Sequence, residues 1–148
     1  MTFPTAFSYD DVLLVPQYSD ITSRKEVELS SALDSERTLS LPIISSPMDT
    51  ITESAMANAM SSAGGLGIIH RYNSIEMQAQ QVFEVTKASS KAAAIGITGD
   101  YLERASALYE AGARVLCLDV AHGHHILMEK AISNIKSLYS DVHIMAGN

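Results

Sequence analysis

The sequence contains a single cysteine and no long apolar run. With Cys117 alone, an internal disulfide is impossible, and this fits a reducing compartment. No uninterrupted apolar stretch approaches the roughly 20 residues that cross a bilayer. The first residues, Met1 to Pro4, lack the basic region and apolar core of a secretory signal. We therefore expect a cytoplasmic protein without a membrane partner.

Positive charge is also scarce. The chain carries 10 Lys and Arg against 17 Asp and Glu, a formal net charge of -7, and the cations are scattered singly. Since a nucleic-acid binder normally presents a basic face, we expect no nucleic-acid partner and favour a small molecule bound through local donors. The 148 residues, 47% of them hydrophobic, allow one globular domain with a sizeable core.

Short apolar runs recur regularly from residue 41 onward. Each is too short for a helix and predicts a strand buried on both faces. The five predicted strands are residues 42–44, 67–69, 92–95, 115–118 and 142–145. Helical spacing between them predicts helices near residues 51–63, after Ser74, from Asp100 to Gly112, and near residues 126–138.

Apolar stripes predict the buried face of each helix. The expected stripes are Met56, Ala59, Met60 and Ala63; Ile75, Ala79, Val82 and Phe83; Leu102, Ala105, Leu108 and Tyr109; and Leu127, Ala131, Ile135 and Leu138. Two pairs, Thr50 with Glu53 and Asp100 with Glu103, have the spacing of a capping box at a helix start.

Strict alternation of strands and helices predicts a parallel sheet with right-handed crossovers. An open doubly wound sheet and a (β/α)8 barrel both fit this order, and the regular spacing favours the barrel. A complete TIM barrel needs roughly 250 residues. Residues 41–148 are therefore expected to supply the first five strands and four helices of an α/β barrel, about half of one. An isolated half would expose two sheet edges.

Residues 1–40 predict an irregular arm that covers one end of this barrel. Within the arm, the apolar residues 12–15, closed by Pro16, predict a short strand. Alternating apolar and polar residues at 27–30 predict a second, half-exposed strand.

Ligands of parallel α/β folds gather at the carboxyl ends of the strands. The segments that follow the five predicted strands are polar, small and glycine-rich: residues 45–50, 70–73, 96–100, 119–125 and 147–148. Such a rim suits a phosphorylated or hydroxylated ligand held by backbone N–H groups, hydroxyls and one carboxylate.

Several rim residues have both a functional and a structural interpretation. Asp119 would accept hydrogen bonds from a ribose diol, or cap the following loop. Ser46 and Met48 would contact a ligand, or cap the next helix and fill the core. Arg71, the only arginine directly after a strand end, would contact a phosphate or carboxylate, although a surface ion pair is favoured.

A metal site is the main rival hypothesis. His122, His124 and His125 lie close to Asp119, and His-x-His is a spacing of zinc ligands, so a metal-dependent barrel hydrolase is an alternative. Against it, Gly123 lies in a flexible turn and no Glu or Cys nearby completes a ligand set, so we expect no metal.

Two further patterns limit the chemistry. Cys117 lies inside a buried strand, where cysteine is normally an inert small hydrophobe, so we do not expect it to be a nucleophile. No Gly-x-Gly-x-x-Gly follows the first strand and no Walker-type loop occurs, so any dinucleotide is bound outside the Rossmann manner.

Long, ordered motifs nonetheless resemble one family, the IMP dehydrogenases and GMP reductases. The resemblance covers nearly the whole chain. The motifs are YDDVLLVP at residues 9–16, SSPMDTITE at 45–53, GGLGIIHR at 64–71, AG at 111–112, DVAHGH at 119–124 and AGN at 146–148.

The resemblance implies a mechanism. In this family a cysteine thiolate after the sixth barrel strand attacks purine C2, and a hydride passes between the purine and a nicotinamide. The dehydrogenase converts IMP, NAD and water to XMP and NADH in guanine nucleotide biosynthesis. The reductase converts GMP and NADPH to IMP and ammonia. The resemblance also implies a possible monovalent-cation site in the full-length protein, and a homotetramer.

The resemblance assigns roles residue by residue. Ser46 and Met48 would contact the purine nucleotide monophosphate, and Asp119 would hold the nicotinamide ribose. Asn148 would lie near the nicotinamide and Thr98 nearer the adenosine end. The catalytic cysteine is expected beyond Asn148, so no catalytic residue is expected in this chain, and the fragment alone is expected to be inactive.

The two activities are not separated by the motifs. Family dehydrogenases commonly insert regulatory CBS modules after the second barrel helix, and residues 85–90 leave no room for them, as in reductases and some dehydrogenases. Residues 117–121 and 144–148 also look reductase-like, whereas residues 45–48 and 67–71 look dehydrogenase-like. We favour the dehydrogenase, with the reductase, a non-catalytic nucleotide-binding fragment and the metal-dependent hydrolase as alternatives.

Overall fold

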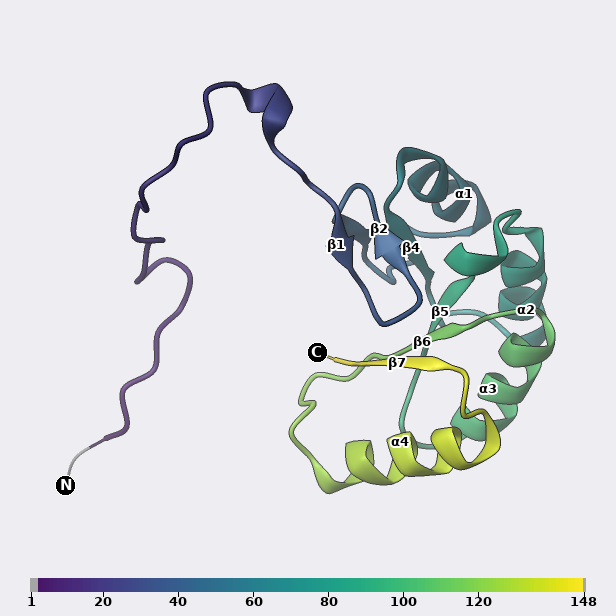
Figure 1. Ribbon diagram of the computed structural model, residues 1–148. Coiled ribbons are helices and arrows are strands. Elements are labelled where there is room, and N and C mark those ends of the chain that lie inside the picture. Colours follow the sequence, from purple (N-terminus) through teal and green to yellow (C-terminus); the bar gives the residue numbers. More distant parts are fainter. Residues whose placement is uncertain (1–2, 148) are drawn as a thin grey trace.

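A computed structural model describes residues 3–147 of the chain (Figure 1). The elements are β1 (Ser31–Ala32), β2 (Thr38–Leu39), β3 (Ile44–Ser45), α1 (Ser54–Ala63), β4 (Leu66–Ile69), α2 (Ile75–Glu84), β5 (Ala92–Ile95), α3 (Tyr101–Glu110), β6 (Val115–Leu118), α4 (Ile126–Leu138) and β7 (His143–Ala146), with 3-10 turns at Arg24–Glu26 and Ala88–Ser90. The predicted alternation of strands and helices is confirmed.

The main sheet is parallel and sequential. Its order is β3-β4-β5-β6-β7, so each strand pairs with the strands that precede and follow it in the chain. A doubly wound sheet reverses its strand order at a switch point, so that alternative is wrong. The four α-helices form an outer layer around one side of the curved sheet (Figure 1). This arrangement is that of part of a TIM barrel.

The two faces of the sheet pack into two separate cores, because successive side chains of a strand point to opposite sides. Leu116 and Leu118 of β6 pack outward against the helices. Val115 of the same strand packs inward with Leu66 and Ile68 of β4. The central strands β4, β5 and β6 are almost entirely buried, as predicted. The prediction that both faces are buried is wrong for β3 and β7, which lie at the open edges of the sheet.

The helices bury narrower and more polar faces than their apolar stripes predict. In α1 the buried residues are Ala57 and Ser61, whereas Met56 of the predicted stripe is exposed. In α2 they are Gln78 and Val82, and Phe83 is 68% exposed. Four of the other predicted stripe residues are also exposed in α1 and α4, and one in α3: Ala59, Ala63, Leu127, Leu138 and Leu102. Arg104 and Met128 are buried instead.

Helix α1 shows why bulky residues are excluded from the interface. A Cβ built on Gly67 of β4 would lie 2.6 Å from the Cα of Ala57. The helix therefore rests on the strand backbone, and only small residues fit between them.

Neither predicted capping box forms. Helix α1 begins at Ser54, and its N-cap residue Glu53 makes no side-chain cap bond. Asp100, at the start of α3, makes none either, because its carboxylate accepts hydrogen bonds from Arg104 instead. Ser74 does cap α2, since its hydroxyl accepts a hydrogen bond from the Met77 N–H.

The arm covers the amino end of the main sheet through a short hairpin. Strands β1 and β2 pair antiparallel, and Leu33 and Leu39 pack against the inner core. Asp34 in the turn lies 3.2 Å from Nδ1 of His143 at the start of β7. The hairpin therefore covers one end of the sheet, as expected for the arm.

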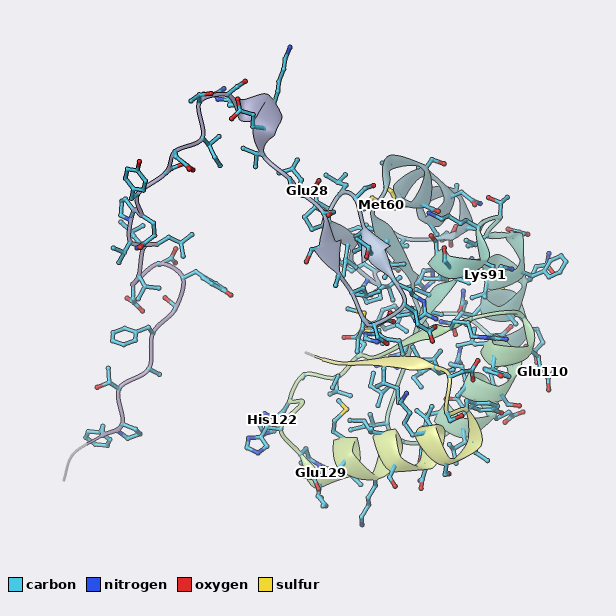
Figure 2. The ribbon with its side chains drawn as sticks, viewed as in Figure 1. Glu28, Met60, Lys91, Glu110, His122 and Glu129 are labelled. Carbon is cyan, nitrogen blue, oxygen red and sulfur yellow. The ribbon has the colours of Figure 1, made fainter. Side chains whose placement is uncertain are left out.

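Residues 3–30 stand clear of the domain, as Figures 1 and 2 show. All of these residues are exposed, and neither predicted strand of the arm, at 12–15 or 27–30, forms. A strand needs a neighbour to satisfy its backbone groups, and none lies beside this segment.

Candidate binding site at the carboxyl ends of the strands

The carboxyl ends of the strands open onto one cleft of about 500 Å³. It collects residues from β3 and its loop, the segment after β4, and the ends of β6 and β7. The lining residues are Ile44, Ser45, Ser46, Pro47, Met48, Ile68, Tyr72, Cys117, Asp119, Met145, Ala146 and Gly147. The predicted convergence of strand tips is therefore confirmed for four of the five strands.

The loop after β3 is held in place by hydrogen bonds to the buried residue Thr52. The Thr52 hydroxyl lies 2.9 Å from Ser45 Oγ and 2.7 Å from the Ser46 carbonyl, while the Thr52 N–H donates to the Met48 carbonyl. This anchoring leaves the Ser46 and Met48 side chains on the cleft wall, and Met48 is 48% exposed. Helix capping by Ser46 and core packing by Met48 are therefore wrong.

Asp119 brings a carboxylate to the cleft. Its N–H donates to the Ile95 carbonyl at 2.9 Å, which extends the pairing of β5 with β6. Within residues 3–147 its carboxylate has no hydrogen-bond donor or ion-pair partner, so loop capping does not occur there. Gly147 lies against this strand end, where an added Cβ would come within 3.0 Å of the Leu118 carbonyl oxygen. The carboxylate is thus free to accept hydrogen bonds from a ligand.

The segment after β4 is anchored by a buried histidine. The Nδ1 atom of His70 accepts a hydrogen bond from the Tyr72 N–H at 3.1 Å. Because Nδ1 accepts, Nε2 carries the ring proton and faces Oε1 of Glu53 at 3.4 Å. This fixes Tyr72 at the cleft wall.

Beside it, the guanidinium of Arg71 lies 5.5 Å from the centre of the Tyr72 ring. Its Nη2 lies 3.5 Å from the Asp119 carbonyl oxygen, and no carboxylate within residues 3–147 pairs with it. The favoured interpretation of Arg71, a surface ion pair, is therefore wrong for the described part of the chain.

A buried polar network supports the rim between β4 and β5. Nε2 of Gln78 donates to the Ile69 and Ala94 carbonyls at 3.3 and 2.8 Å. Its Oε1 accepts from Arg104 Nη1 at 2.9 Å, and Arg104 also donates to the Asn73 carbonyl. The network joins two helices to the strand ends, which explains why α2 and α3 bury polar residues.

Replacing Gln78 with leucine is expected to lower the free energy of unfolding by about 2 kcal/mol, because buried Arg104 loses an acceptor that leucine cannot replace. Urea unfolding followed by circular dichroism measures the change. Gln80→Leu on the exposed side of the same helix is the matched control and should change stability by less than about 0.5 kcal/mol. Equal effects of the two substitutions would show that the network does not stabilise the fold.

Cys117 lies on the inner face of β6 and forms part of the cleft wall. Burial, and secondarily the nearby Asp119 charge, raise the pKa of its thiol to about 11. A thiol with such a pKa is almost fully protonated near neutral pH and is a poor nucleophile. That Cys117 is not the nucleophile stays a prediction.

We expect iodoacetamide to modify Cys117 about a hundredfold more slowly at pH 8 in the folded protein than in urea, because the pKa rises by about two units. The folded rate should keep increasing with pH up to about 11. Mass spectrometry of timed samples measures both rates. A folded rate equal to the unfolded one would contradict the raised pKa.

The structure bears on only one of the two remaining predicted cofactor residues. Thr98 is exposed in the loop after β5 and does not line the cleft. Asn148 lies outside the described residues. Conversely, sequence reasoning missed Tyr72, whose only signal is an aromatic side chain just after a strand end. It also missed Cys117 and Met145 as wall residues, although period-2 alternation places both on the inner face with Val115.

The histidine cluster forms no metal site in the described part of the chain. Within residues 3–147, no three His, Cys, Asp or Glu side chains gather closely enough to hold an ion. His125 instead caps α4, because its Nδ1 accepts the Leu127 N–H, and His122 points outward from the loop (Figure 2). The metal-dependent hydrolase therefore loses its ligand set.

No helix in the described part of the chain has the length and apolar character needed to cross a membrane.

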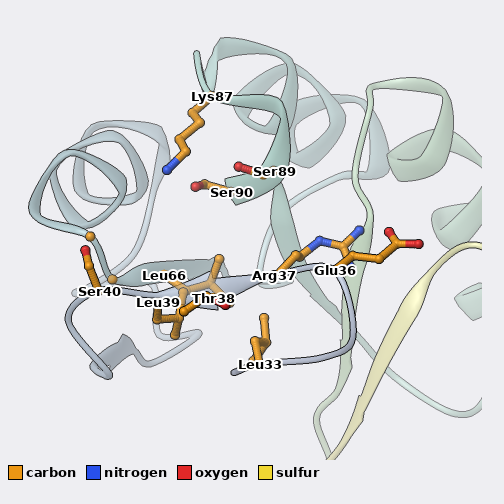
Figure 3. Close-up of a pocket in the computed structure, with 12 residues that line it drawn as sticks. Leu33, Glu36, Arg37, Thr38, Leu39, Ser40, Leu66, Lys87, Ser89 and Ser90 are labelled. Atoms are coloured by element: carbon orange, nitrogen blue, oxygen red, sulfur yellow. The ribbon is translucent and has the colours of Figure 1, made fainter. Parts of the chain in front are cut away.

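A smaller cavity of about 170 Å³ lies at the opposite, amino end of the sheet, beneath the β1–β2 hairpin (Figure 3). Several of its polar groups bond to protein. Arg37 pairs with Asp34, and the Ser90 hydroxyl accepts a hydrogen bond from Ser61. In parallel α/β folds, ligands bind at the other end of the strands, so we assign no ligand to this cavity.

The sequential parallel sheet, with a cleft at its carboxyl end, has the arrangement of part of an α/β barrel. The profile of the IMP dehydrogenase / GMP reductase domain matches residues 6–148, and the chain belongs to this family. The resemblance seen in the motifs is therefore confirmed.

Curated relatives carry both family names. The chain is 50% identical over 90 residues to inosine-5'-monophosphate dehydrogenase of Nitrosopumilus maritimus, covering 61% of this chain and 19% of the relative. It is 32% identical over 185 residues to the Cryptosporidium parvum dehydrogenase, covering 95% and 45%. It is 46% identical over 89 residues to GMP reductase of Leishmania donovani, covering 60% and 18%.

The matches thus span less than half of each of these relatives. The Cryptosporidium parvum alignment, at 185 residues, is longer than this 148-residue chain, so that relative carries residues that this chain lacks.

Proposed function

We propose that this chain provides the first half of the (β/α)8 barrel of a cytoplasmic IMP dehydrogenase, which oxidises IMP with NAD and water to XMP in guanine nucleotide biosynthesis. Residues 1–40 are the arm, and residues 41–148 are the barrel part. The observation that carries the proposal is the meeting of Ser46, Met48 and Asp119 in one cleft of a chain that belongs to this family.

The cleft has two chemically distinct sides that suit two nucleotides. Ser46 offers a hydroxyl and Met48 an apolar surface, which together fit the polar and flat parts of a purine nucleotide. Asp119 offers a carboxylate to which no donor of residues 3–147 is hydrogen-bonded, which fits the two hydroxyls of a ribose. When bound, the nicotinamide cofactor accepts the hydride, and the residues of this chain bind and orient both ligands.

The remaining assignments extend from this arrangement. Asn148 would contact the nicotinamide side and Thr98 the adenosine end of the cofactor. We expect the thiolate nucleophile to come from outside the 148 residues, because burial raises the pKa of Cys117, their only cysteine, to about 11. We also expect any monovalent-cation site to lie outside these residues. We expect the fragment alone to be inactive and the full-length enzyme to be a homotetramer, with further strands pairing along the open edges of β3 and β7.

GMP reductase is the second candidate, favoured by the identity with the Leishmania donovani reductase. Both reactions can be followed at 340 nm with the protein that contains this chain and the rest of the barrel. Absorbance that rises with IMP and NAD, with XMP formed, supports the dehydrogenase. Absorbance that falls with GMP and NADPH identifies the reductase instead.

The fragment provides the control. The 148-residue chain alone should turn over neither substrate pair. Turnover by the fragment would refute an external nucleophile, and nucleotide binding without turnover by the full-length protein would favour a non-catalytic role.

A further inference from the structure

Arg71 occupies the gap between the cleft and the loop after β5. On one side its guanidinium lies beside Tyr72 and the Asp119 carbonyl, which belong to the cleft wall. On the other side, a Cβ built on Gly96 would lie 3.9 Å from Nη1 of Arg71 and 3.8 Å from the Thr98 carbonyl oxygen. A ligand that extends from Asp119 towards Thr98 therefore passes the guanidinium.

The charge of Arg71 is unused within the described chain. No carboxylate of residues 3–147 pairs with it, and its only hydrogen bond is the long one to a backbone carbonyl. Its Nε is shielded from solvent and has no partner among these residues. A buried donor without an acceptor is costly, and an anionic ligand would supply the missing acceptors.

The position of Arg71 indicates which anionic group it contacts, the phosphate of the purine nucleotide or the diphosphate of the dinucleotide. The purine nucleotide would lie against Ser46 and Met48 in the loop after β3. Arg71 instead lies beside Asp119 and Gly96, on the cofactor side of the cleft. Between the two riboses of a dinucleotide lies a diphosphate, whose oxygens match the forked donors of a guanidinium.

We propose that Arg71 binds the diphosphate of the nicotinamide dinucleotide and so fixes the cofactor between Asp119 and Thr98. This proposal rests on the proposed function and adds a cofactor-specific residue to it. Gly96 places no side chain beside Nη1 of Arg71, where a built Cβ would lie 3.9 Å away, so the phosphates can approach the guanidinium.

The test compares ligands with and without the diphosphate on the full-length protein. Calorimetric titration measures the Kd for NAD and for IMP, and saturation-transfer NMR measures binding of nicotinamide riboside, which lacks the diphosphate. We expect Arg71→Gln to weaken NAD binding about 10- to 100-fold, the loss typical of a charge-assisted hydrogen bond. IMP and nicotinamide riboside should bind as they do to the unmodified protein.

Two variants serve as controls. Arg71→Lys keeps the charge without the fork and should lose less affinity for NAD than Arg71→Gln. Arg24→Gln removes the same charge from the exposed arm and should leave NAD binding unchanged. The KM for NAD should rise in parallel with the Kd, while the KM for IMP should not.

The outcomes separate this proposal from the proposed function. Turnover of IMP and NAD with NAD affinity unchanged in Arg71→Gln would refute the diphosphate contact alone. An equal loss for NAD and nicotinamide riboside would assign Arg71 a structural role and would also refute it. Failure of the unmodified protein to bind or reduce NAD would overturn both.

Discussion

Replacing Asp119 with alanine is expected to lower kcat/KM for NAD at least about a hundredfold in the full-length protein, equivalent to about 3 kcal/mol. The proposed ribose diol would lose its carboxylate acceptor, and the cofactor would lose both affinity and orientation. The Kd for IMP should change little, because Ser46 and Met48 lie in a different loop. Steady-state kinetics with each substrate varied in turn measures the two effects.

The controls for Asp119 use the same protein. Asp119→Asn keeps the shape and should recover only part of the activity, whereas Asp20→Asn in the exposed arm should change nothing. Asp119→Asn should also lower the pKa of Cys117 and speed its alkylation, because the Asp119 charge raises that pKa. Unchanged kinetics in Asp119→Ala would remove Asp119 from the cofactor site.

Replacing Gly67 with alanine is expected to lower the free energy of unfolding by about 3 kcal/mol, near the upper end for an overpacked core. The new Cβ would lie 2.6 Å from the Cα, 3.1 Å from the Cβ and 3.3 Å from the N of Ala57. These are backbone and near-backbone atoms of α1, so no side-chain rotation relieves the clash and the helix must move away from β4. Urea unfolding followed by circular dichroism measures the loss.

Gly99→Ala is the matched control for Gly67→Ala. Gly99 has a φ of +65° and no atom within 4 Å of a built Cβ, so this substitution costs only the strain of a left-handed residue, about 1 kcal/mol. If Gly67→Ala is no more destabilising than Gly99→Ala, the close contact between α1 and β4 is not a constraint on the fold.

Local periodicity was sufficient to predict the order of the elements from β3 to β7 and the direction of the main sheet. The predicted helix at residues 126–138 coincides with α4, and the strand at residues 115–118 coincides with β6. Periodicity failed where burial depends on distant partners. Gln78 is buried because two strand-end carbonyls and Arg104 surround it, and no apolar stripe contains that information.

The candidate site was predictable to the extent that strand ends define it. Ser46, Met48 and Asp119 follow directly after strands, so parallel pairing brings them together. Thr98 also follows a strand, but it does not line the cleft. Arg71 lies between the cleft and the loop after β5. This position could not be predicted, since it depends on how two loops pack.

The sequential strand order has a consequence for how the protein is made. Each strand of the main sheet pairs with the one synthesised just before it, from β3 with β4 to β6 with β7. Contacts of short sequence separation form fast, and nascent chains fold from the N-terminus as they leave the ribosome. We therefore expect this sheet to assemble one β-α unit at a time during translation, with its last strand edge ready as a template for whatever chain emerges next.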